Sequence, residues 1–379
     1  MLNRVNILII GHGVLGGRVL EFLSQSGRPY DLHVGARDVQ RAFLKANLAR
    51  YTALNLGHHP TIEVVPIDLM NMEATAERLA ALRPDIIFNA TTLHSREIIT
   101  QLPPDAYRQI DRAGAGVWIP LHLVLVRCLM KAVREAGLDS MVVNASYPDV
   151  TNAALAAEGL SPAIGIGNIG NAVPGIRLAA AHVLGCELKA IDVRFFAQHF
   201  VSDRIQRIGS TGGAPYYLAI YQEGQRLRPE ELAHDNLFAN VARHFRGVQG
   251  LAGQVVAASS ATNVLRAFAD RIERVVHAPG PLGLVGGYPV RIAPTGISID
   301  LPEGLSLDHA EEINTECLKY DGIGAVESDG TVRFTGESTE VMRELLGYDC
   351  QAIALDECED RAKELVAKYV EYSRSFDQL

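Results

Sequence analysis

The first 145 residues alternate short, almost wholly apolar runs with longer segments whose apolar residues recur every three or four positions. Such runs are typical of strands buried on both faces, and the longer period is typical of amphipathic helices. We therefore expect strands at residues 5–10, 31–35, 61–68, 85–90 and 141–145, and helices at residues 14–27, 38–50, 73–82, 105–113 and 121–136. This alternation predicts an α/β fold with a Rossmann-type parallel sheet, which binds ligands at the carboxyl ends of its strands.

The pattern changes after the strand at 141–145. The apolar stretches at residues 185–200 and 216–224 are expected to be strands, the first of them long. The segments 287–302 and 325–335 carry turn residues at their centres, which predicts β-hairpins. Strands joined by tight turns are antiparallel, so this half is expected to be α+β with a largely antiparallel sheet. The expected domains are a Rossmann domain at 1–145, an α+β substrate and dimerisation domain at 146–350, and a C-terminal helix within 351–379 that packs back on the first domain.

Three glycines follow the first strand where the first helix begins. Gly11 permits a tight strand-to-helix turn, Gly13 lets the backbone approach a pyrophosphate, and Gly16 allows close packing of the helix on the strand. Free N–H groups at the helix N-terminus attract phosphates. The sequence therefore predicts a dinucleotide site whose turn comprises Gly11, His12, Gly13, Val14, Leu15 and Gly16.

A second GxGxxG pattern occurs at Gly165, Gly167 and Gly170. Ser161 and Pro162 interrupt the apolar run before it, and no βαβ series surrounds it. We therefore interpret this segment as a close-packed loop that faces the cleft.

The residues after the second strand bear on the choice of cofactor. NAD sites usually place a carboxylate there to bind the ribose diol, whereas here Arg37 comes first and Asp38 follows. A guanidinium can stack on adenine and pair with a 2′-phosphate, so NADP(H) is preferred. NAD(H) stays open, because the Asp38 carboxylate either caps the next helix or reaches the diol. Further cofactor contacts are expected at later strand ends, from Asp68, Asn89, Ala90, Thr91, Asn144 and Ser146.

Four residues are candidates for catalysis. Tyr147 and Asp149 follow the last parallel strand, at the expected mouth of the cleft, although Asp149 could equally cap a helix. His199 lies at the end of the apolar stretch 185–200, and His277 opens a loop rich in Gly and Pro. An imidazole exchanges protons near neutral pH, so both histidines are candidates, with a structural role as the alternative for each. The histidines lack metal-ligand spacing, so no metal is expected.

Composition limits the partners. The 379 residues include 48% hydrophobic and 21% charged side chains, and the net charge of −9 comes without a basic run, which argues against a nucleic-acid partner. The apolar runs are shorter than the roughly 20 residues of a spanning helix, so no membrane partner is expected. We expect a cytoplasmic protein with a small-molecule substrate. Its five cysteines, none in CxxC spacing, are expected to be reduced.

Together with the glycine turn, the segments VGARD (34–38), VPIDLMN (65–71) and DIIFNAT (85–91) resemble the nucleotide-binding half of saccharopine dehydrogenase-like oxidoreductases. The resemblance covers about the first 145 residues, and Arg37 matches a position where NADP-using members carry arginine. The second half is similar only in plan to dihydrodipicolinate reductase-type enzymes. Both families act on amino or imino acids, so the resemblance implies amino acid metabolism.

The expected function is therefore that of an NADP(H)-dependent dehydrogenase or reductase. Its substrate would be an amino-acid-like, carboxylate-bearing metabolite that reacts at a C=N, C=O or CH–NH bond. Two alternatives stay open: a homospermidine synthase-like enzyme that uses bound NAD(P) transiently, and a non-catalytic NADP-binding sensor. The antiparallel half is the expected surface of a homodimer.

Overall fold

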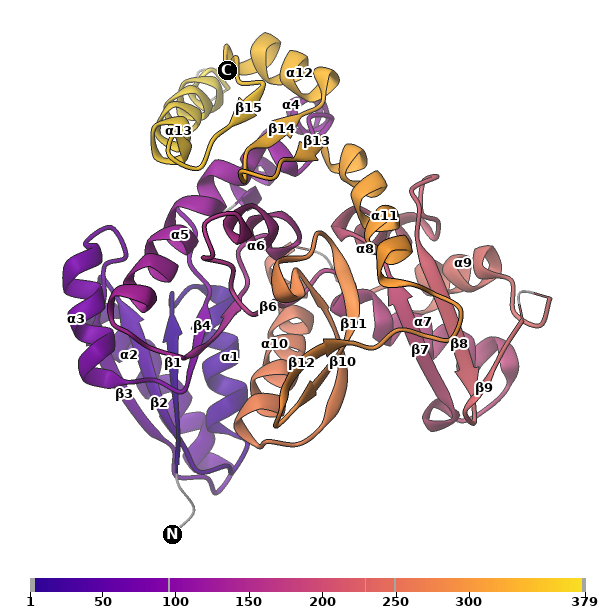
Figure 1. The fold of residues 1–379 in the computed structure, drawn as a ribbon, viewed down its shortest axis with the longest axis horizontal. Helices are drawn as coiled ribbons and strands as arrows, with labels where there is room; N and C mark the ends of the chain where they lie inside the picture. Colours follow the sequence, from indigo (N-terminus) through magenta and orange to yellow (C-terminus); the bar gives the residue numbers. More distant parts are fainter. Residues whose placement is uncertain (1–3, 95, 229, 249, 377–379) are drawn as a thin grey trace.

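A parallel sheet forms the centre of the computed structural model, which describes residues 4–94, 96–228, 230–248 and 250–376. Within these residues it has six strands in the order β3-β2-β1-β4-β5-β6 (Figure 1). This is the Rossmann order, in which the winding of the chain reverses between β1 and β4. The strands are β1 (Val5–Ile10), β2 (Tyr30–Ala36), β3 (Thr61–Pro66), β4 (Ile86–Asn89), β5 (Met141–Asn144) and β6 (Ile164–Gly165).

Helices cover both faces of this sheet, and β1 shows why its sequence is continuously apolar. Ile7 and Ile9 pack among residues of α1, α2 and α10, whereas Leu8 and Ile10 pack among residues of α3 and α5. Strands buried on both faces have no solvent side on which to place polar residues. The helices of this half are α1 (Val14–Ser24), α2 (Val39–Asn55), α3 (Met72–Leu82), α4 (Pro104–Asp111), α5 (Ile119–Glu135) and α6 (Pro148–Ala156).

The last strand of the sheet lies beyond the predicted domain boundary at residue 145. Ile164 and Gly165 pair in parallel with Val143 and Asn144 of β5, after the chain has passed through α6. The first domain therefore continues to Gly165. A strand of two residues that follows Pro162 is too short for an apolar run to mark it.

The second half contains small antiparallel sheets, as its hairpin patterns predict. In the described part of the chain these are β7-β8-β9, β10-β11-β12 and β13-β14-β15. The strands are β7 (Ile191–Phe196), β8 (Tyr217–Gln222), β9 (Gln225–Arg226), β10 (Arg274–Pro279), β11 (Gly287–Ala293), β12 (Gly296–Ile299), β13 (Ile323–Val326), β14 (Val332–Phe334) and β15 (Ala352–Ile353). The helices are α7 (Ile169–Leu184), α8 (His199–Ile208), α9 (His234–His244), α10 (Gln254–Ala269), α11 (Leu307–Cys317), α12 (Gly336–Leu346) and α13 (Cys358–Arg374).

The strand predicted at residues 185–200 ends earlier than expected. It covers only β7, and His199 is the first residue of α8. The N–H group of His199 donates to Oδ1 of Asp149 at 3.1 Å, so a carboxylate from α6 satisfies the first turn of α8. These two residues are 50 positions apart, and no local pattern indicates their contact.

The second GxGxxG segment is closely packed, as interpreted from the sequence, but only residues 166–168 form a loop, since Gly165 ends β6 and Gly170 lies in α7. A Cβ at Gly165 would lie 2.2 Å from Cβ of Pro148, and one at Gly170 would lie 2.6 Å from the carbonyl oxygen of His277. These glycines are required by contact between protein segments, which differs from the phosphate approach expected of a dinucleotide turn.

The C-terminal helix α13 packs against α5 of the first half (Figure 1). The rings of Trp118 and Tyr369 meet edge to face with centroids 5.7 Å apart, and the Tyr369 hydroxyl donates to the carbonyl of Ile98 at 2.9 Å. The segment Gly116–Glu135 has the length and mean hydropathy, 1.6, of a membrane span, but 67% of that window is buried inside the protein. Packing against α3, α6 and α13 accounts for its apolar composition.

Candidate functional site

Two adjoining cavities lie at the carboxyl ends of the parallel strands. The arginine cavity, of about 440 Å³, extends past the end of β2 and is lined by Arg37, Arg41 and Lys45. The histidine cavity, of about 410 Å³, extends past the end of β5 and is lined by His122 and His199. The two cavities share the lining residues Gly13, Ala90, Thr91 and Thr92. They therefore form one cleft across the point where the winding of the sheet reverses.

The glycine turn meets the requirements of a phosphate cradle. Gly11 has φ +94°, and a Cβ there would lie 2.7 Å from the carbonyl oxygen of Ala90. A Cβ at Gly16 would lie 1.9 Å from the carbonyl oxygen of Gly11, whereas one at Gly13 would meet no described atom within 4 Å. No described side chain caps α1 at Gly13. The N–H groups of its first turn are therefore available to an anion that approaches Gly13, as a dinucleotide requires.

His12, the residue between the first two glycines, also faces the arginine cavity. Its backbone carbonyl accepts a hydrogen bond from Nζ of Lys45 at 2.8 Å. Neither ring nitrogen has a partner among the described residues. Burial, followed by the nearby Lys45 charge, lowers the pKa of His12 to about 4. The imidazole is therefore neutral at pH 7, with both ring nitrogens buried beside the glycine turn.

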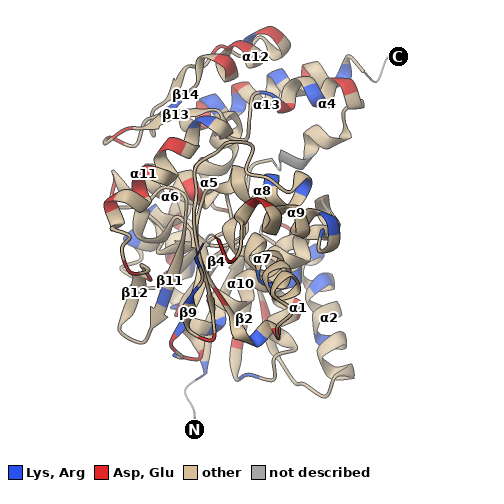
Figure 2. Cartoon of the chain, turned by 90° about the vertical axis from the view of Figure 1, so that its right-hand side faces the viewer, with Lys and Arg blue, Asp and Glu red and all other residues tan. Residues whose placement is uncertain are grey.

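The carboxylate of Asp38 serves as a helix cap. Its Oδ1 accepts the N–H of Arg41 at 2.9 Å at the start of α2. Asp68, which also lines the arginine cavity, accepts the N–H of Met70 at 3.1 Å, while Asn71 caps α3. Basic and acidic residues are interspersed over most helices (Figure 2), and the arginine cavity also carries both kinds, since Arg37, Arg41 and Lys45 line it together with Asp38 and Asp68. A ligand phosphate is the group that such cations favour.

Asn89 and Asn144, two of the predicted cofactor contacts, are buried behind the residues that line the cleft. Asn89 and Asn144 are 0% exposed, and Nδ2 of Asn89 donates to Oδ1 of Asn144 at 3.0 Å. Oδ1 of Asn89 accepts from the Thr91 hydroxyl at 2.7 Å, and Oδ1 of Asn144 accepts from the Ser146 N–H at 2.9 Å. These amides fix the strand ends, while Ala90, Thr91 and Ser146 line the cleft itself.

A buried charge cluster forms one wall of the histidine cavity. Nδ1 of His199 lies 3.1 Å from Oδ2 of Asp321, and the Tyr147 hydroxyl donates to the same oxygen at 3.3 Å. Burial opposes the charge on His199, but the Asp321 carboxylate and then Asp149 outweigh it and raise the pKa of His199 to about 9. His199 is therefore an imidazolium at pH 7, and it is held where a ligand in the cavity can reach it.

Asp149 lies beneath this cluster. It is 0% exposed, its Oδ1 accepts the backbone N–H of His199, and its Oδ2 accepts from the side-chain amide of Asn168. Burial raises the pKa of Asp149 to about 6 against the lowering effects of His199 and Asn168. Its contacts are those of a positioning residue for α8, because both carboxylate oxygens are engaged by protein groups.

Tyr147 has an unusual backbone. Its φ of +46° places it in the left-handed region, which side chains larger than glycine rarely adopt. Such strain is concentrated at functional sites, where the surrounding structure maintains it. The conformation places the Tyr147 ring between those of His122 and His199, with both centroid distances at 5.9 Å.

Sequence reasoning missed three residues of the histidine cavity and its wall. His122 lies in an apolar helical segment, and its Nδ1 is 3.1 Å from the hydroxyl of Ser146. Asn168 lies within the second glycine pattern, between Gly167 and Gly170, and Asp321 is 122 positions from His199. The cavity-facing loop inferred for the second pattern was the one signal that pointed to Asn168.

His277 does not join this cluster. It lies in β10, lines a different cavity of about 400 Å³, and its Nε2 accepts the N–H of Phe195 at 3.2 Å. Burial, followed by the nearby Arg194 charge, lowers the pKa of His277 to about 3. We therefore correct the catalytic prediction for His277 to a structural role, in which a neutral ring joins β10 to β7.

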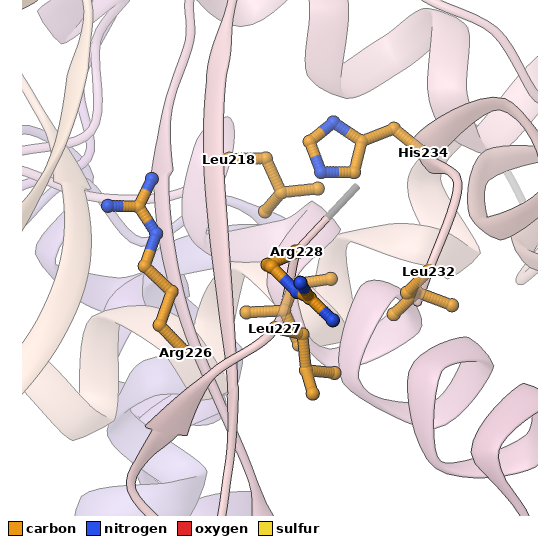
Figure 3. A pocket seen from close by; sticks show the side chains of 7 residues that line it. Leu218, Arg226, Leu227, Arg228, Leu232 and His234 are labelled. Atoms are coloured by element: carbon orange, nitrogen blue, oxygen red, sulfur yellow. The ribbon is translucent and has the colours of Figure 1, made fainter. Parts of the chain in front are cut away.

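A smaller cavity of about 280 Å³ lies beside β8 and β9 (Figure 3). Arg226 donates to the Tyr217 hydroxyl and the Glu303 carbonyl, and Arg228 pairs with Glu231. Protein groups already engage both cations, so this cavity offers less to an anion than the cleft does.

The described architecture can be compared with known proteins. The lactate dehydrogenase of Cryptosporidium parvum, solved with lactic acid and β-nicotinamide adenine dinucleotide, superposes with a TM-score of 0.55 at 15% identity, covering 85% of this chain and 99% of that one. The malate dehydrogenase of Plasmodium falciparum gives 0.56 at 13% identity, covering 89% and 99%. The chain shares the fold of these dehydrogenases. The malate dehydrogenase of Cryptosporidium parvum gives 0.56 at 14% identity, covering 84% and 96%. No family model and no curated protein sequence matches the chain.

The predicted resemblance to saccharopine dehydrogenase-like oxidoreductases is wrong. The structural neighbours are lactate and malate dehydrogenases, and the likeness extends through the second half as well as the first. The glycine turn and the strand ends that suggested the resemblance are requirements of dinucleotide binding, and many families share them. The expectation of amino acid metabolism rested on that resemblance and is therefore not supported.

Alanine at Gly13 and Gly16 is expected to separate cofactor binding from stability. Gly16→Ala should lower the free energy of unfolding by about 1–3 kcal/mol, since its Cβ collides with the Gly11 carbonyl. Gly13→Ala should unfold at the wild-type temperature but bind a nicotinamide dinucleotide about tenfold more weakly or worse, since its methyl group occupies the approach to the backbone. Thermal unfolding and fluorescence titration with NADH and NADPH measure both effects. Wild-type affinity of Gly13→Ala for these dinucleotides would contradict this placement of the phosphates.

Proposed function

We propose that this protein is an NADP(H)-dependent oxidoreductase that interconverts a carboxylate-bearing hydroxy acid and its keto acid. The observation that carries the proposal is the His199–Asp321 pair, which faces a small cavity continuous with the glycine turn. A bound nicotinamide would supply or accept the hydride. The chain must then supply a proton at the substrate oxygen, and an imidazole held by a buried carboxylate is suited to that task.

His199 is proposed to donate the proton in the reductive direction and to accept it in the oxidative direction. Asp321 fixes the ring through Nδ1, which leaves Nε2 for the substrate oxygen. Tyr147 bonds the same carboxylate and packs against the imidazole, so it helps to orient the pair.

The substrate class rests on the cavity and on the neighbours together. The Cryptosporidium parvum lactate dehydrogenase was solved with lactic acid as substrate, and the fold is shared over most of both chains. A volume of about 410 Å³ is at the small end for ligand sites and must also hold the nicotinamide. We therefore propose a short-chain acid. The homodimer and the cytoplasmic location stay predictions.

The preference for NADP(H) rests on the arginine cavity. The neighbours bind NAD or NADH in their solved complexes. Here, however, Asp38 is occupied as the cap of α2, while Arg37, Arg41 and Lys45 line the cavity. Three cations near the end of β2 favour a 2′-phosphate over an unmodified ribose diol.

Arg37→Ser is expected to weaken NADPH binding selectively. Loss of one charge-assisted bond to a phosphate should cost about 1.5–3 kcal/mol, or roughly 10- to 150-fold in Kd, while NADH binding should change little. Isothermal titration with both cofactors measures the change. Arg78→Ser on the exposed face of α3 is the matched control. An equal loss for the two cofactors would contradict the role of Arg37 in phosphate recognition.

The proton-transfer role predicts a pH dependence. His199 has a raised pKa of about 9, so kcat/KM for reduction should fall as the pH rises through about 9, because the donor loses its proton. The oxidative direction should gain activity over the same range. Asp321→Asn removes the carboxylate that raises this pKa and should move both transitions toward 6.5, the ordinary histidine value.

His199→Gln is expected to lower kcat/KM by about 10²–10⁴-fold with little change in NADPH affinity, because it removes the proton donor but not the cofactor site. His309→Gln, at an exposed site on α11, is the control. Steady-state kinetics with a panel of short keto acids makes the measurement. Full turnover by His199→Gln would exclude His199 as the donor. NADPH binding without oxidation by any acid would favour a synthase or a sensor instead.

A further inference from the structure

The side of α2 that faces away from the parallel sheet is apolar, and the helix lies at the outside of the protein (Figure 2). Seven large apolar side chains of residues 39–56 are 38–61% exposed, and these are Val39, Phe43, Leu44, Leu48, Tyr51, Leu54 and Leu56. Exposed apolar residues that occur singly are ordinary on protein surfaces. A group of this size is typical of a surface that another molecule covers.

The spacing along α2 shows that these residues are not part of its packing on the first domain. The buried side, which lies against α1, β2 and β3, consists of the alanines Ala42, Ala46, Ala49 and Ala53. Leu44, Leu48 and Tyr51 recur at four and three positions on the opposite side, where they form one stripe, the α2 stripe. A helix with apolar residues on both sides is typical of a helix that is covered on both.

The α2 stripe carries no charge. The helix contains no acidic residue, and two of its cations bond to the chain itself. Lys45 donates to the carbonyl of His12 at 2.8 Å, and Arg50 donates to the carbonyl of Ile62 on β3. Arg41 lines the arginine cavity. Two copies of an uncharged stripe can therefore meet across a two-fold axis without like charges opposing each other.

The size of the apolar surface fits a dimer. If a large apolar side chain has about 200 Å² of surface, the seven exposed side chains present roughly 700 Å² together. A stable interface covers about 800 Å² on each partner, and its core is poor in charged residues and rich in aromatic ones. The polar residues beside the stripe, among them Gln40, Asn47 and Asn55, supply further area.

We propose that the α2 stripe pairs with the same stripe of a second copy of this chain, which gives a two-fold symmetric dimer. The interface then lies on the Rossmann half, whereas the sequence pattern suggested the antiparallel half. The stripe includes neither the glycine turn nor His199, so the dimer does not depend on the proposed reaction.

Sedimentation velocity of the full chain over a range of concentrations tests the proposal, and we expect a dimer. Leu48→Glu places a carboxylate of each copy at the centre of the interface, so it should raise the Kd of the dimer at least about 100-fold. Leu178→Glu changes a leucine on α7 that is 39% exposed, and this matched control should leave the dimer intact. A monomeric wild type, or equal effects of the two variants, would overturn the proposal.

Further variants separate association from folding. Tyr51→Glu, in the same stripe, should also dissociate the dimer, and Leu48→Met should preserve it because the contact stays apolar. The dissociated variants should keep the far-ultraviolet circular dichroism of the wild type, since their substituted side chains are exposed in the single chain. A dimer that survives both glutamate substitutions would contradict pairing through the α2 stripe.

A lipid surface is the other kind of partner that an apolar stripe beside cations could fit. Vesicles of phosphatidylcholine and phosphatidylglycerol test this alternative. We expect no co-sedimentation of the wild type, because the dimer covers the stripe. Co-sedimentation of a monomeric wild type that Leu48→Glu abolishes would assign the stripe to a membrane and overturn the proposed dimer.

Discussion

The candidate site depends on two buried carboxylates, Asp149 and Asp321, that both bond to one partly exposed histidine. Asp149 and Asp321 are at most 3% exposed, and an isolated charge at such a position is strongly unfavourable. His199 offsets this cost, since its ring pairs with Asp321 and its backbone N–H bonds to Asp149. The same contacts begin α8 and link it to α6. The position of α8 and the geometry of the His199–Asp321 pair therefore depend on one another.

The two halves of the chain contribute different residues to the cleft. The parallel sheet supplies the glycine turn, the cations at the end of β2 and the small residues Ala90 and Thr91. The second half supplies His199 and Asp321, neither of which belongs to the Rossmann motif. This division is typical of enzymes in which one domain binds the cofactor and another adds the chemistry.

Features set by residues close together in the sequence could be predicted, whereas contacts between distant residues could not. The strand and turn at residues 5–16 were predictable because the apolar run and the glycine spacing form a local pattern, although the close contact at Gly11 is with the distant Ala90 carbonyl. His199 was found as an ionisable residue, but its partner Asp321 was invisible because only the tertiary fold brings them together. Nothing in the sequence distinguishes His277 from His199 as a candidate for catalysis. In the structure, Nε2 of His277 accepts a hydrogen bond from the Phe195 N–H. The family resemblance failed because the motifs that carried it reflect what any dinucleotide site needs.

Transfer of isotope from the cofactor to a product tests hydride transfer in this cleft directly. The protein is incubated with NADPH deuterated on either face of C4 of the nicotinamide and with a panel of short 2-keto acids, and the products are analysed by mass spectrometry. We expect one deuterium at C2 of a 2-hydroxy acid, from one face only. Absence of deuterium in every product, from both labelled cofactors, would contradict hydride transfer in this cleft.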